Sequence, residues 1–564
     1  MKFQQFEYVR PDFAALDQEF HTLLDRFAQS GSFAEQDHAM EAIVNLRGEY
    51  ESMEAIARIR HTMDTTDAFY KAEQEFIDEH APLYQGLITE YYQALVDSPY
   101  RSELEAKWGK QLFTIAELSL RTFSPEIVDD LVQENKLASE YSKLLASAKL
   151  MYEGEERNLS QLAPFQLSTD RTVRKAANDM KYNFFEENEA ELDDIYDQLV
   201  RIRTTIARKL GFSNFVELAY IRLNRSDYNA GQVQAFRDQV LTHIVPVATK
   251  LKDRQKARIG VESLRYYDDK YIFATGNPKP QGGPDWIVEQ ARRMYAELSP
   301  ETNEFFNFMI DNGLMDLVAK KGKRVGGYCS FISKYKAPFI FSNFNGTSGD
   351  IDVLTHEVGH AFQGYCSRDY AVPEYTFPTL EACEIHSMSM EFLAWPWMEL
   401  FFAEETDKYK FKHLSDSLMF IPYGVAVDEF QHRVYEQPNL SPAERKLVWR
   451  EIERKYLPHR VYEDQAYLER GGFWQQQPHI FKSPFYYIDY TLAQVCALQF
   501  WKRANETPEQ AWQDYLRLCK QGGSQSFLSL VEVADLISPF QDGCVASIIG
   551  HIEAWLDQVD DTQL

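Results

Sequence analysis

The chain has 564 residues, and its 86 Asp and Glu residues outnumber its 59 Lys and Arg residues to give a formal net charge of −27. Hydrophobic residues make up 45% of the chain, which is enough for a large buried core and excludes disordered and collagen-like proteins. A surface this acidic repels nucleic-acid phosphates and anionic lipid, so we expect neither nucleic acid nor a membrane as a partner.

The N-terminal residues and the cysteines predict a reduced, cytoplasmic protein. Residues 1–7 lack the apolar segment of a signal peptide, and no later stretch approaches the roughly 18 uninterrupted apolar residues of a membrane span. The six cysteines form no C-x-x-C pair, so neither a redox pair nor a thiolate zinc site is expected.

The N-terminal part of the chain has the periodicity of amphipathic helices. Apolar residues recur at three- and four-residue steps in residues 16–27 and again in residues 40–59. Residues 68–95 form a further long helical stretch, which Pro82 is expected to end or kink because proline removes a backbone donor. Helices therefore dominate the predicted fold.

Another helical block covers residues 173–210. Its acidic run, residues 186–191, predicts a solvated helix face. Before this block, Pro164 breaks the helical pattern and a Ser-Thr-Asp cluster offers a helix cap. We therefore predict two regions, residues 1–164 and residues 165–564.

Two interruptions of the helical pattern follow. The glycine- and proline-rich residues 276–284 predict a loop. Residues 324–345 are rich in aromatic and β-branched residues and predict two or three short strands, broken by Pro338. The turn-forming residues 346–350 then cap a helix that begins at Asp350.

That helix contains the sequence His356-Glu357-Val358-Gly359-His360. Two imidazoles four residues apart lie on one face of a helix, as two ligands of a tetrahedral Zn²⁺ require. The glutamate between them projects near the same ion, where it can hold and deprotonate a metal-bound water. The alternative is two ordinary histidines of the core or surface, which would have no partner to offset their desolvation.

A catalytic zinc site needs a third protein ligand. Residues 380–392 form a second helical segment, with Ile385, Met388 and Phe392 at core positions. The candidate ligands downstream of the motif are Glu374, Glu381, Glu384, His386 and Glu391. The spacing alone leaves the choice among them open.

The motif, followed about 24 residues later by a helical glutamate, resembles the thimet oligopeptidase / oligoendopeptidase F family of zinc metallopeptidases. In that family the ligand glutamate is followed seven residues on by another glutamate. Glu384 has Glu391 at that place, whereas Glu381 has Met388. The implied ligands of one Zn²⁺ per chain are His356, His360 and Glu384.

Other parts of the chain carry the same resemblance. Residues 169–176 and 207–215 look like segments of the oligoendopeptidase F group, and the chain length fits its compact bacterial members, including the Pz-peptidases. Glu381 and Asp352 are candidates to orient a ligand histidine. For Asp352 the alternative is a partner of the helix dipole, as for other acids in a first helical turn.

Residues 478–490 are dense in tyrosine and histidine, which commonly donate to an oxyanion. Taken alone, such aromatic clusters are usually part of a core or rim. The segment resembles the family's C-terminal substrate-binding stretch, which implies that His479, Tyr487 and Tyr490 contact substrate and stabilise the oxyanion. Tyr490 is the first choice as donor and Tyr487 the second, and Tyr486 is either core or ligand.

Residues 337–343 are similar to the family's edge strand, on which an extended peptide pairs through backbone hydrogen bonds. An ordinary edge strand is the alternative. The turn Gly326-Gly327-Tyr328 would fit a glycine-rich segment that contacts substrate.

The resemblance implies a mainly α, elongated helical ellipsoid with a small β-sheet beside the motif helix and a deep central substrate channel. Residues 1–164 would form part of the channel wall, and residues 165–564 the catalytic domain. The implied activity is a zinc-dependent endopeptidase that hydrolyses internal bonds of short unfolded oligopeptides, with Glu357 activating a zinc-bound water.

Two alternatives stay open at this point. A carboxypeptidase or dipeptidyl carboxypeptidase on the same scaffold would need a cation for the substrate's C-terminal carboxylate, and the sequence identifies none. A non-catalytic, zinc-containing peptide-binding protein would have no use for the general base Glu357. Cleavage-site preference, oligomeric state and the metal loaded in the cell are not encoded in these motifs.

Overall fold

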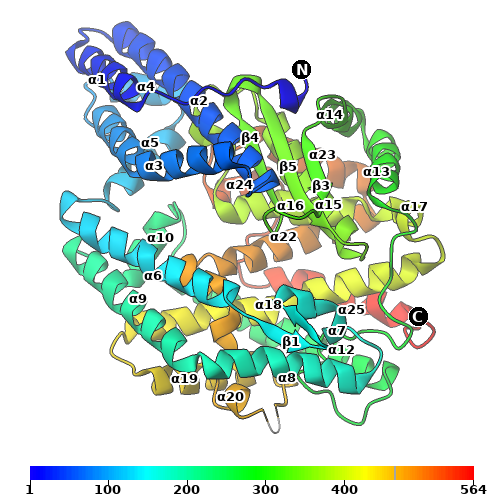
Figure 1. Ribbon diagram of the computed structural model, residues 1–564. Coiled ribbons are helices and arrows are strands. Elements are labelled where there is room, and N and C mark those ends of the chain that lie inside the picture. Colours follow the sequence, from blue (N-terminus) through cyan, green and yellow to red (C-terminus); the bar gives the residue numbers. More distant parts are fainter. Residues whose placement is uncertain (463–464) are drawn as a thin grey trace.

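The computed structural model describes residues 1–462 and 465–564 and is built mainly of α-helices (Figure 1). A hairpin joins β1 (Leu150–Tyr152) to β2 (Glu155–Arg157), and a second sheet has the strand order β3-β5-β4. The predicted mainly α fold with a small β-sheet is confirmed. In the part of the chain that is described, no helix is both long and apolar enough to cross a membrane.

The N-terminal helices lie at one end of the molecule (Figure 1). They are α1 (Phe13–Gln29), α2 (Phe33–Met63), α3 (Ala68–Val96), α4 (Arg101–Trp108) and α5 (Lys110–Leu120). Pro82 lies inside α3, so it does not end this helix, and the kink that was expected as the alternative stays a prediction. The packing of α3 against α2 and α5 outweighs the one backbone hydrogen bond that proline removes.

Buried apolar residues of these helices, from Leu16 to Ala116, form a core that is joined by Val372 and Tyr375. From Ile127 onward the chain contributes to the large core of the rest of the molecule. The large core also contains residues that precede Leu16 or belong to α2, namely Phe3, Phe6, Met53, Ile56 and Ile59. The two cores therefore do not divide the chain at a single residue, and the boundary at 164/165 stays a prediction.

The helical block predicted over residues 173–210 is two helices, α8 (Arg171–Glu187) and α9 (Glu189–Lys209). The acidic run therefore spans the junction at Asn188 instead of lying on one solvated helix face. Arg470 Nη2 holds the junction, donating to Glu186 Oε1 at 3.0 Å and to Glu189 Oε2 at 2.9 Å. Arg470, which comes from a distant part of the chain, thus balances the charge of the two carboxylates on either side of the junction.

The three-stranded sheet consists of β3 (Met315–Val318), β4 (Tyr328–Ile332) and β5 (Ala337–Phe344). β5 pairs in parallel with β3 and antiparallel with β4, with Pro338 opposite Phe331. β5 is thus the central strand, and the prediction that it is an edge strand is wrong. The reason is that β3, which precedes the predicted strand region, pairs with the second side of β5. The edge strand beside the loop at residues 326–327 is β4.

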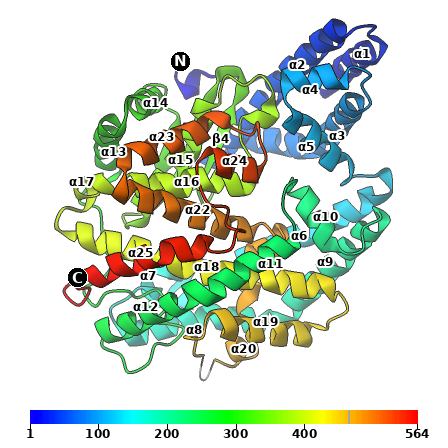
Figure 2. The ribbon, with the colours of Figure 1, turned by 180° about the vertical axis from the view of Figure 1, so that it is seen from behind.

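The motif helix α15 (Gly349–Cys366) begins within one residue of its predicted start and packs against β4 and β5. Asp350 fixes its N-terminus by accepting from the backbone N–H groups of Asn345 and Gly346, both at 2.8 Å. Helix α16 (Leu380–Leu393) packs on α15. Figure 2 shows α22 (Tyr487–Glu506) and α23 (Pro508–Gln521) covering this pair from behind.

Candidate metal centre and active site

Helices α15 and α16 bring two imidazoles and one carboxylate together. His356 and His360 project from consecutive turns of α15 toward Glu384 of α16. Glu384 Oε2 lies 3.3 Å from His356 Nε2 and 3.5 Å from His360 Nε2. Within residues 1–462 and 465–564, this is the one group of three His, Cys, Asp or Glu side chains whose ligand atoms converge, all within 4.8 Å of one another.

The donor set and its spacing fit a zinc ion. Two ligand atoms that are each about 2.0–2.1 Å from a tetrahedral ion are separated by about 3.4 Å, which matches the distances from Glu384 to His356 and His360. Burial would raise the pKa of Glu384, but the two imidazoles outweigh burial and hold this pKa well below its usual value. Two imidazoles and one ionised carboxylate also form a ligand set that catalytic zinc uses.

The other candidate ligands lie elsewhere. Glu374 accepts hydrogen bonds from the N-terminal helices, and Glu381 accepts one from Tyr228 at 3.1 Å. His386 is fully buried, and burial lowers its pKa to about 3. Asp352 accepts from Tyr409 at 2.6 Å.

Glu391 is the residue that orients His356, one of the candidate metal ligands. Its Oε1 lies 2.7 Å from His356 Nδ1, and its Oε2 lies 2.8 Å from Nε2 of His413 in α18 (Thr406–Glu436). Trp395 Nε1–H in turn donates to His413 Nδ1 at 3.1 Å. His413 therefore carries its proton on Nε2 and donates to Glu391, and a relay of three side chains fixes the ring of His356.

Replacing Glu391 by Gln is expected to lower zinc affinity about 10- to 100-fold, because an amide has one oxygen and cannot accept from both imidazoles. Competition with a chromophoric chelator measures the affinity. Glu374→Gln removes a similarly buried carboxylate far from the metal centre and should leave zinc affinity unchanged. Equal affinities for wild type and Glu391→Gln would contradict the orienting role.

Gly359, inside the motif, is the point at which α15 and α16 touch. A Cβ atom at this position would lie 2.6 Å from the carbonyl oxygen of His386 and 2.6 Å from Ser387 Cα. Both contacts are with the backbone of α16, which cannot rotate away as a side chain can. The absence of a side chain at Gly359 thus sets the distance at which Glu384 meets the two histidines.

Gly359→Ala is expected to destabilise the protein by about 1–3 kcal/mol, because overpacking forces the two helices apart. Urea unfolding of metal-free protein measures this. A control is Gly48→Ala in α2, where a Cβ meets nothing within 4 Å; alanine should there stabilise the helix by about 0.5–1 kcal/mol. Equal stability of Gly359→Ala and wild type would show that α16 is not held at contact distance.

Glu357 lies in the motif between the two histidines and is 7% exposed. Burial raises its pKa above the usual value, which suits a group that accepts a proton near neutrality. Its Oε2 is buried without a hydrogen-bond partner among the described residues. A Cβ at Gly327 would lie 3.1 Å from Oε1, so the predicted glycine-rich turn before β4 does lie against this carboxylate.

The predicted oxyanion donors form one aromatic cluster. The ring of His479 has its centroid 4.9 Å from that of Tyr487 and 5.8 Å from that of Tyr490. Tyr486 joins the cluster at 4.9 Å from Tyr490, and its hydroxyl donates to Glu384 Oε1 at 3.0 Å. The cluster is thus tied to the metal centre through Tyr486, whose role the sequence leaves open.

A buried ion pair positions this cluster at the start of α22. Arg225 Nη2 donates to Asp489 Oδ1 at 2.6 Å and to the carbonyl of Phe485 at 2.7 Å. Phe485 has a φ of +67°, a left-handed conformation that non-glycine residues seldom adopt. Its N–H donates to Gln431 at 2.9 Å, which compensates part of the strain.

The protonation states of the cluster suit hydrogen-bond donors. Burial raises the pKa of Tyr487 and of Tyr490, so both phenols keep their protons. Burial and the nearby charge of Lys482 lower the pKa of His479 to about 4, so this ring is neutral at pH 7. Gln477 Nε2 donates to His479 Nδ1 at 2.7 Å, which leaves the proton of His479 on Nε2.

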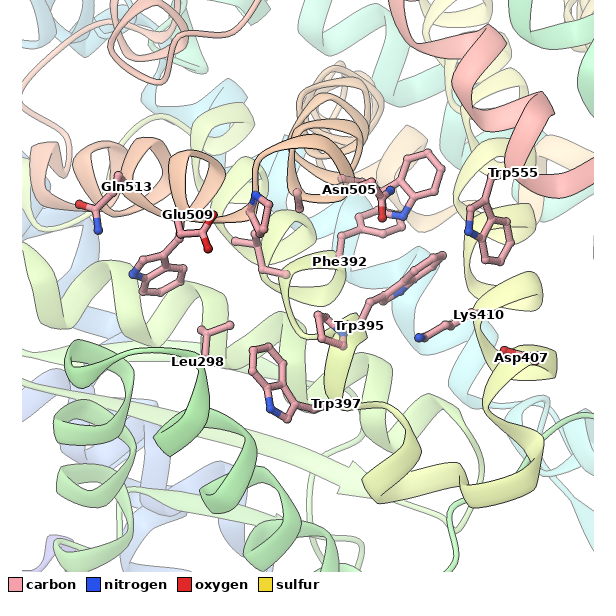
Figure 3. A pocket seen from close by; sticks show the side chains of 16 residues that line it. Leu298, Phe392, Trp395, Trp397, Asp407, Lys410, Asn505, Glu509, Gln513 and Trp555 are labelled. Carbon is pink, nitrogen blue, oxygen red and sulfur yellow. The ribbon is translucent and has the colours of Figure 1, made fainter. Parts of the chain in front are cut away.

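A separate cavity of about 550 Å³ has Trp395 in its wall (Figure 3). Indole rings dominate its wall, and Figure 3 labels Trp395, Trp397 and Trp555 around it. The described residues that line it do not include the three metal-ligand candidates. The cavity is linked to the candidate metal centre only indirectly, because Trp395 in its wall contacts His413, which contacts Glu391. We therefore treat it as distinct from the active site.

The interactions that the sequence did not predict come from remote segments. His413 and Trp395 carry no motif that would separate them from other core aromatic residues, and Gln477 is one of many polar residues before the tyrosine cluster. Glu391 is the one exception, because its spacing from Glu384 marks it in the sequence.

The chain matches known protein families over most of its length. Residues 3–123 match the model of the Peptidase M3 N-terminal domain, and residues 288–548 match that of Peptidase family M3. The solved structure of Pz peptidase A with an inhibitor is 62% identical, with each chain covered completely and a TM-score of 0.94.

More distant relatives share the fold or part of the sequence. An oligoendopeptidase F homolog from Borreliella burgdorferi is 22% identical over 430 residues, which is 71% of each chain. Oligoendopeptidase-F from Enterococcus faecium is 16% identical over 98% of this chain and 99% of its own, with a TM-score of 0.63, which shows the shared fold. The chain therefore belongs to peptidase family M3, within its oligoendopeptidase F group, and is a peptide hydrolase.

Proposed function

We propose that this peptide hydrolase is a zinc-dependent endopeptidase that cuts internal bonds of short, unfolded peptides in the cytoplasm. The observation that carries the proposal is the convergence of His356, His360 and Glu384 beside the buried carboxylate of Glu357. We propose one Zn²⁺ per chain at these three ligands. When bound, zinc would supply Lewis-acid activation of water and of the scissile carbonyl.

In this proposal, the side chains of the protein move protons and stabilise charge. Glu357 takes a proton from the attacking water and passes one to the leaving amine. Tyr490, with Tyr487 and His479, donates hydrogen bonds to the oxyanion that develops on the scissile carbonyl. Neutral phenols and a neutral imidazole are suitable donors, because they stabilise the developing charge without themselves being deprotonated.

We also propose, from the family fold, that the enzyme selects its substrates by size. A deep channel, walled in part by residues 1–164, would admit an extended peptide and exclude a folded protein. The outer edge of β4, beside the turn at Gly327, offers backbone groups to such a peptide. Recognition through the backbone would give affinity with little dependence on sequence.

Mass spectrometry of products from end-blocked peptides of about 5 to 30 residues, with and without chelator, tests the proposal. We expect internal cuts that a chelator abolishes, that added zinc restores and that fade with increasing length. Trimming from free ends alone would replace the endopeptidase by a carboxypeptidase or dipeptidyl carboxypeptidase. No cleavage by zinc-loaded protein would leave a peptide-binding protein as the better account.

A further inference from the structure

A cavity of about 610 Å³ adjoins the aromatic cluster of the active site. Tyr487 lines it, and so do Gln477, which fixes the tautomer of His479, and Tyr423, which donates to Gln477 at 2.9 Å. Phe420 completes this wall, with its ring centroid 5.6 Å from that of Tyr487 and 6.5 Å from that of Tyr490. A peptide bound at Tyr490 therefore has this cavity within the reach of a neighbouring residue.

The lining of this cavity is rich in basic side chains, although the chain as a whole has a net charge of −27. Two of these cations are neutralised locally. Lys252 Nζ lies 2.6 Å from Asp269 Oδ1, and Lys412 Nζ lies 2.7 Å from Asp416 Oδ2. Each of these two pairs is electrically neutral, so neither attracts an anionic ligand.

Lys181 of α8 lines the same cavity and has no such counterion in the part of the chain that the structure describes. Its Nζ donates to the neutral amide oxygen of Gln476 at 2.5 Å, and no carboxylate of the described residues lies within ion-pair distance of it. Burial, together with the charges of Lys270 and Arg460, lowers the pKa of Lys181 to about 7. A desolvated ammonium without a carboxylate is costly, so this site gains from an anionic ligand.

Arg460 adds positive charge to the same wall. Its Nη1 pairs with Glu453 Oε1 at 3.1 Å, but Glu453 is shared with Arg450, whose Nη1 lies 3.1 Å from Oε2. Arg450 also pairs with Glu469 at 2.9 Å, and Glu469 pairs in turn with Arg454 at 3.0 Å, so two carboxylates serve three guanidinium groups. The guanidinium of Arg460 also lies over the ring of Phe473 at 4.0 Å, which fixes it in the cavity wall.

We propose that this cavity is a substrate subsite for a carboxylate, held by the ammonium of Lys181 in the positive field of Arg460 and Lys270. The inference rests on the proposed function, because it adds a specificity-determining residue to the same active site. The carboxylate comes from an Asp or Glu side chain of the peptide or from its C-terminus. A lysine or arginine side chain at this subsite is repelled, so the enzyme discriminates against basic residues there.

The test measures kcat/KM for peptides that share one scissile segment. In amide-capped peptides, Glu, Gln or Lys replaces one residue at a time on either side of the cut bond. One further peptide carries Gln throughout and a free C-terminal carboxylate. Wild type is expected to prefer Glu over Gln about 10-fold or more at one position, the effect of a charge-assisted hydrogen bond in a desolvated site.

Three variants assign the preference to Lys181. Lys181→Met should abolish the ratio of Glu to Gln peptide, whereas Lys181→Arg, which keeps the charge, should preserve most of it. Lys143→Met removes an exposed lysine of α6 (Val128–Ala146), and should leave both the ratio and the activity as in wild type. The ratio is measured within one preparation, so a partly unfolded variant does not change it.

Each outcome separates this inference from the proposed function. A preference for Glu within capped peptides assigns the subsite to acidic side chains, and a preference only for the free C-terminus assigns it to the chain end. Equal rates for the capped Glu, Gln and Lys peptides and for the peptide with a free C-terminus, all cut internally, would overturn the subsite and leave the endopeptidase intact. A full preference retained by Lys181→Met would overturn the role of Lys181, and no cleavage of any peptide would overturn both proposals.

Discussion

Glu357→Gln is expected to lower kcat for peptide hydrolysis by about 10²- to 10⁴-fold while zinc content stays at one ion per chain. Gln has the size of Glu and fills the same buried space beside Gly327, but its amide cannot accept a proton from the attacking water. The three proposed metal ligands keep their contacts with one another, since Glu357 takes part in none of these contacts. The variant therefore separates chemistry from metal binding.

Initial rates with an internally quenched peptide, together with zinc analysis of the same preparation, measure both quantities. Glu391→Gln is the matched comparison, because it changes a carboxylate of the same site and is expected to lose zinc affinity first. Unchanged turnover of Glu357→Gln would show that another group takes the proton. Loss of zinc would show instead that Glu357 belongs to the metal site.

Tyr490→Phe is expected to lower kcat by about 10²- to 10³-fold with little change in KM, the loss that follows removal of one oxyanion donor. Phe keeps the ring and its packing against Tyr486 and His479, so only the hydroxyl is removed. A hydrogen bond made only to the developing oxyanion contributes to kcat and not to substrate binding.

Tyr100→Phe serves as the control for this substitution. The hydroxyl of Tyr100 donates to the carbonyl of Gly31 in the N-terminal helices, far from the site, and its loss should leave kcat unchanged. If Tyr490→Phe retains full activity and Tyr487→Phe does not, the donor is Tyr487. A rise in KM that matches the fall in kcat/KM, with kcat unchanged, would assign Tyr490 to substrate binding instead.

The convergence of His356, His360 and Glu384 could be predicted in part from helical periodicity and spacing. His356 and His360 are one turn apart, and the family resemblance selects Glu384 over Glu381 because Glu391 follows Glu384 by seven residues. These relations are local to two helices. The close approach of the two helices depends on Gly359. Its role becomes clear only from the fold, which places the backbone of α16 2.6 Å from the position that a Cβ atom would occupy.

What the sequence did not predict depends on contacts between remote segments. The central position of β5 depends on β3, whose four residues give too short a pattern to stand out from their surroundings. The relay from Trp395 through His413 joins α18 to α16, and no spacing links these residues to the motif. The ammonium of Lys181 has no carboxylate partner among the described residues, and this likewise depends on which carboxylates fold near it.

The most direct test of the account is anomalous diffraction at the zinc edge from crystals of the zinc-loaded protein. We expect one strong peak per chain, about 2.0–2.2 Å from Nε2 of His356, Nε2 of His360 and a carboxylate oxygen of Glu384. A fully loaded protein whose peak lies elsewhere, or whose peak lacks Glu384 as a ligand, would contradict the proposed metal centre and the mechanism built on it.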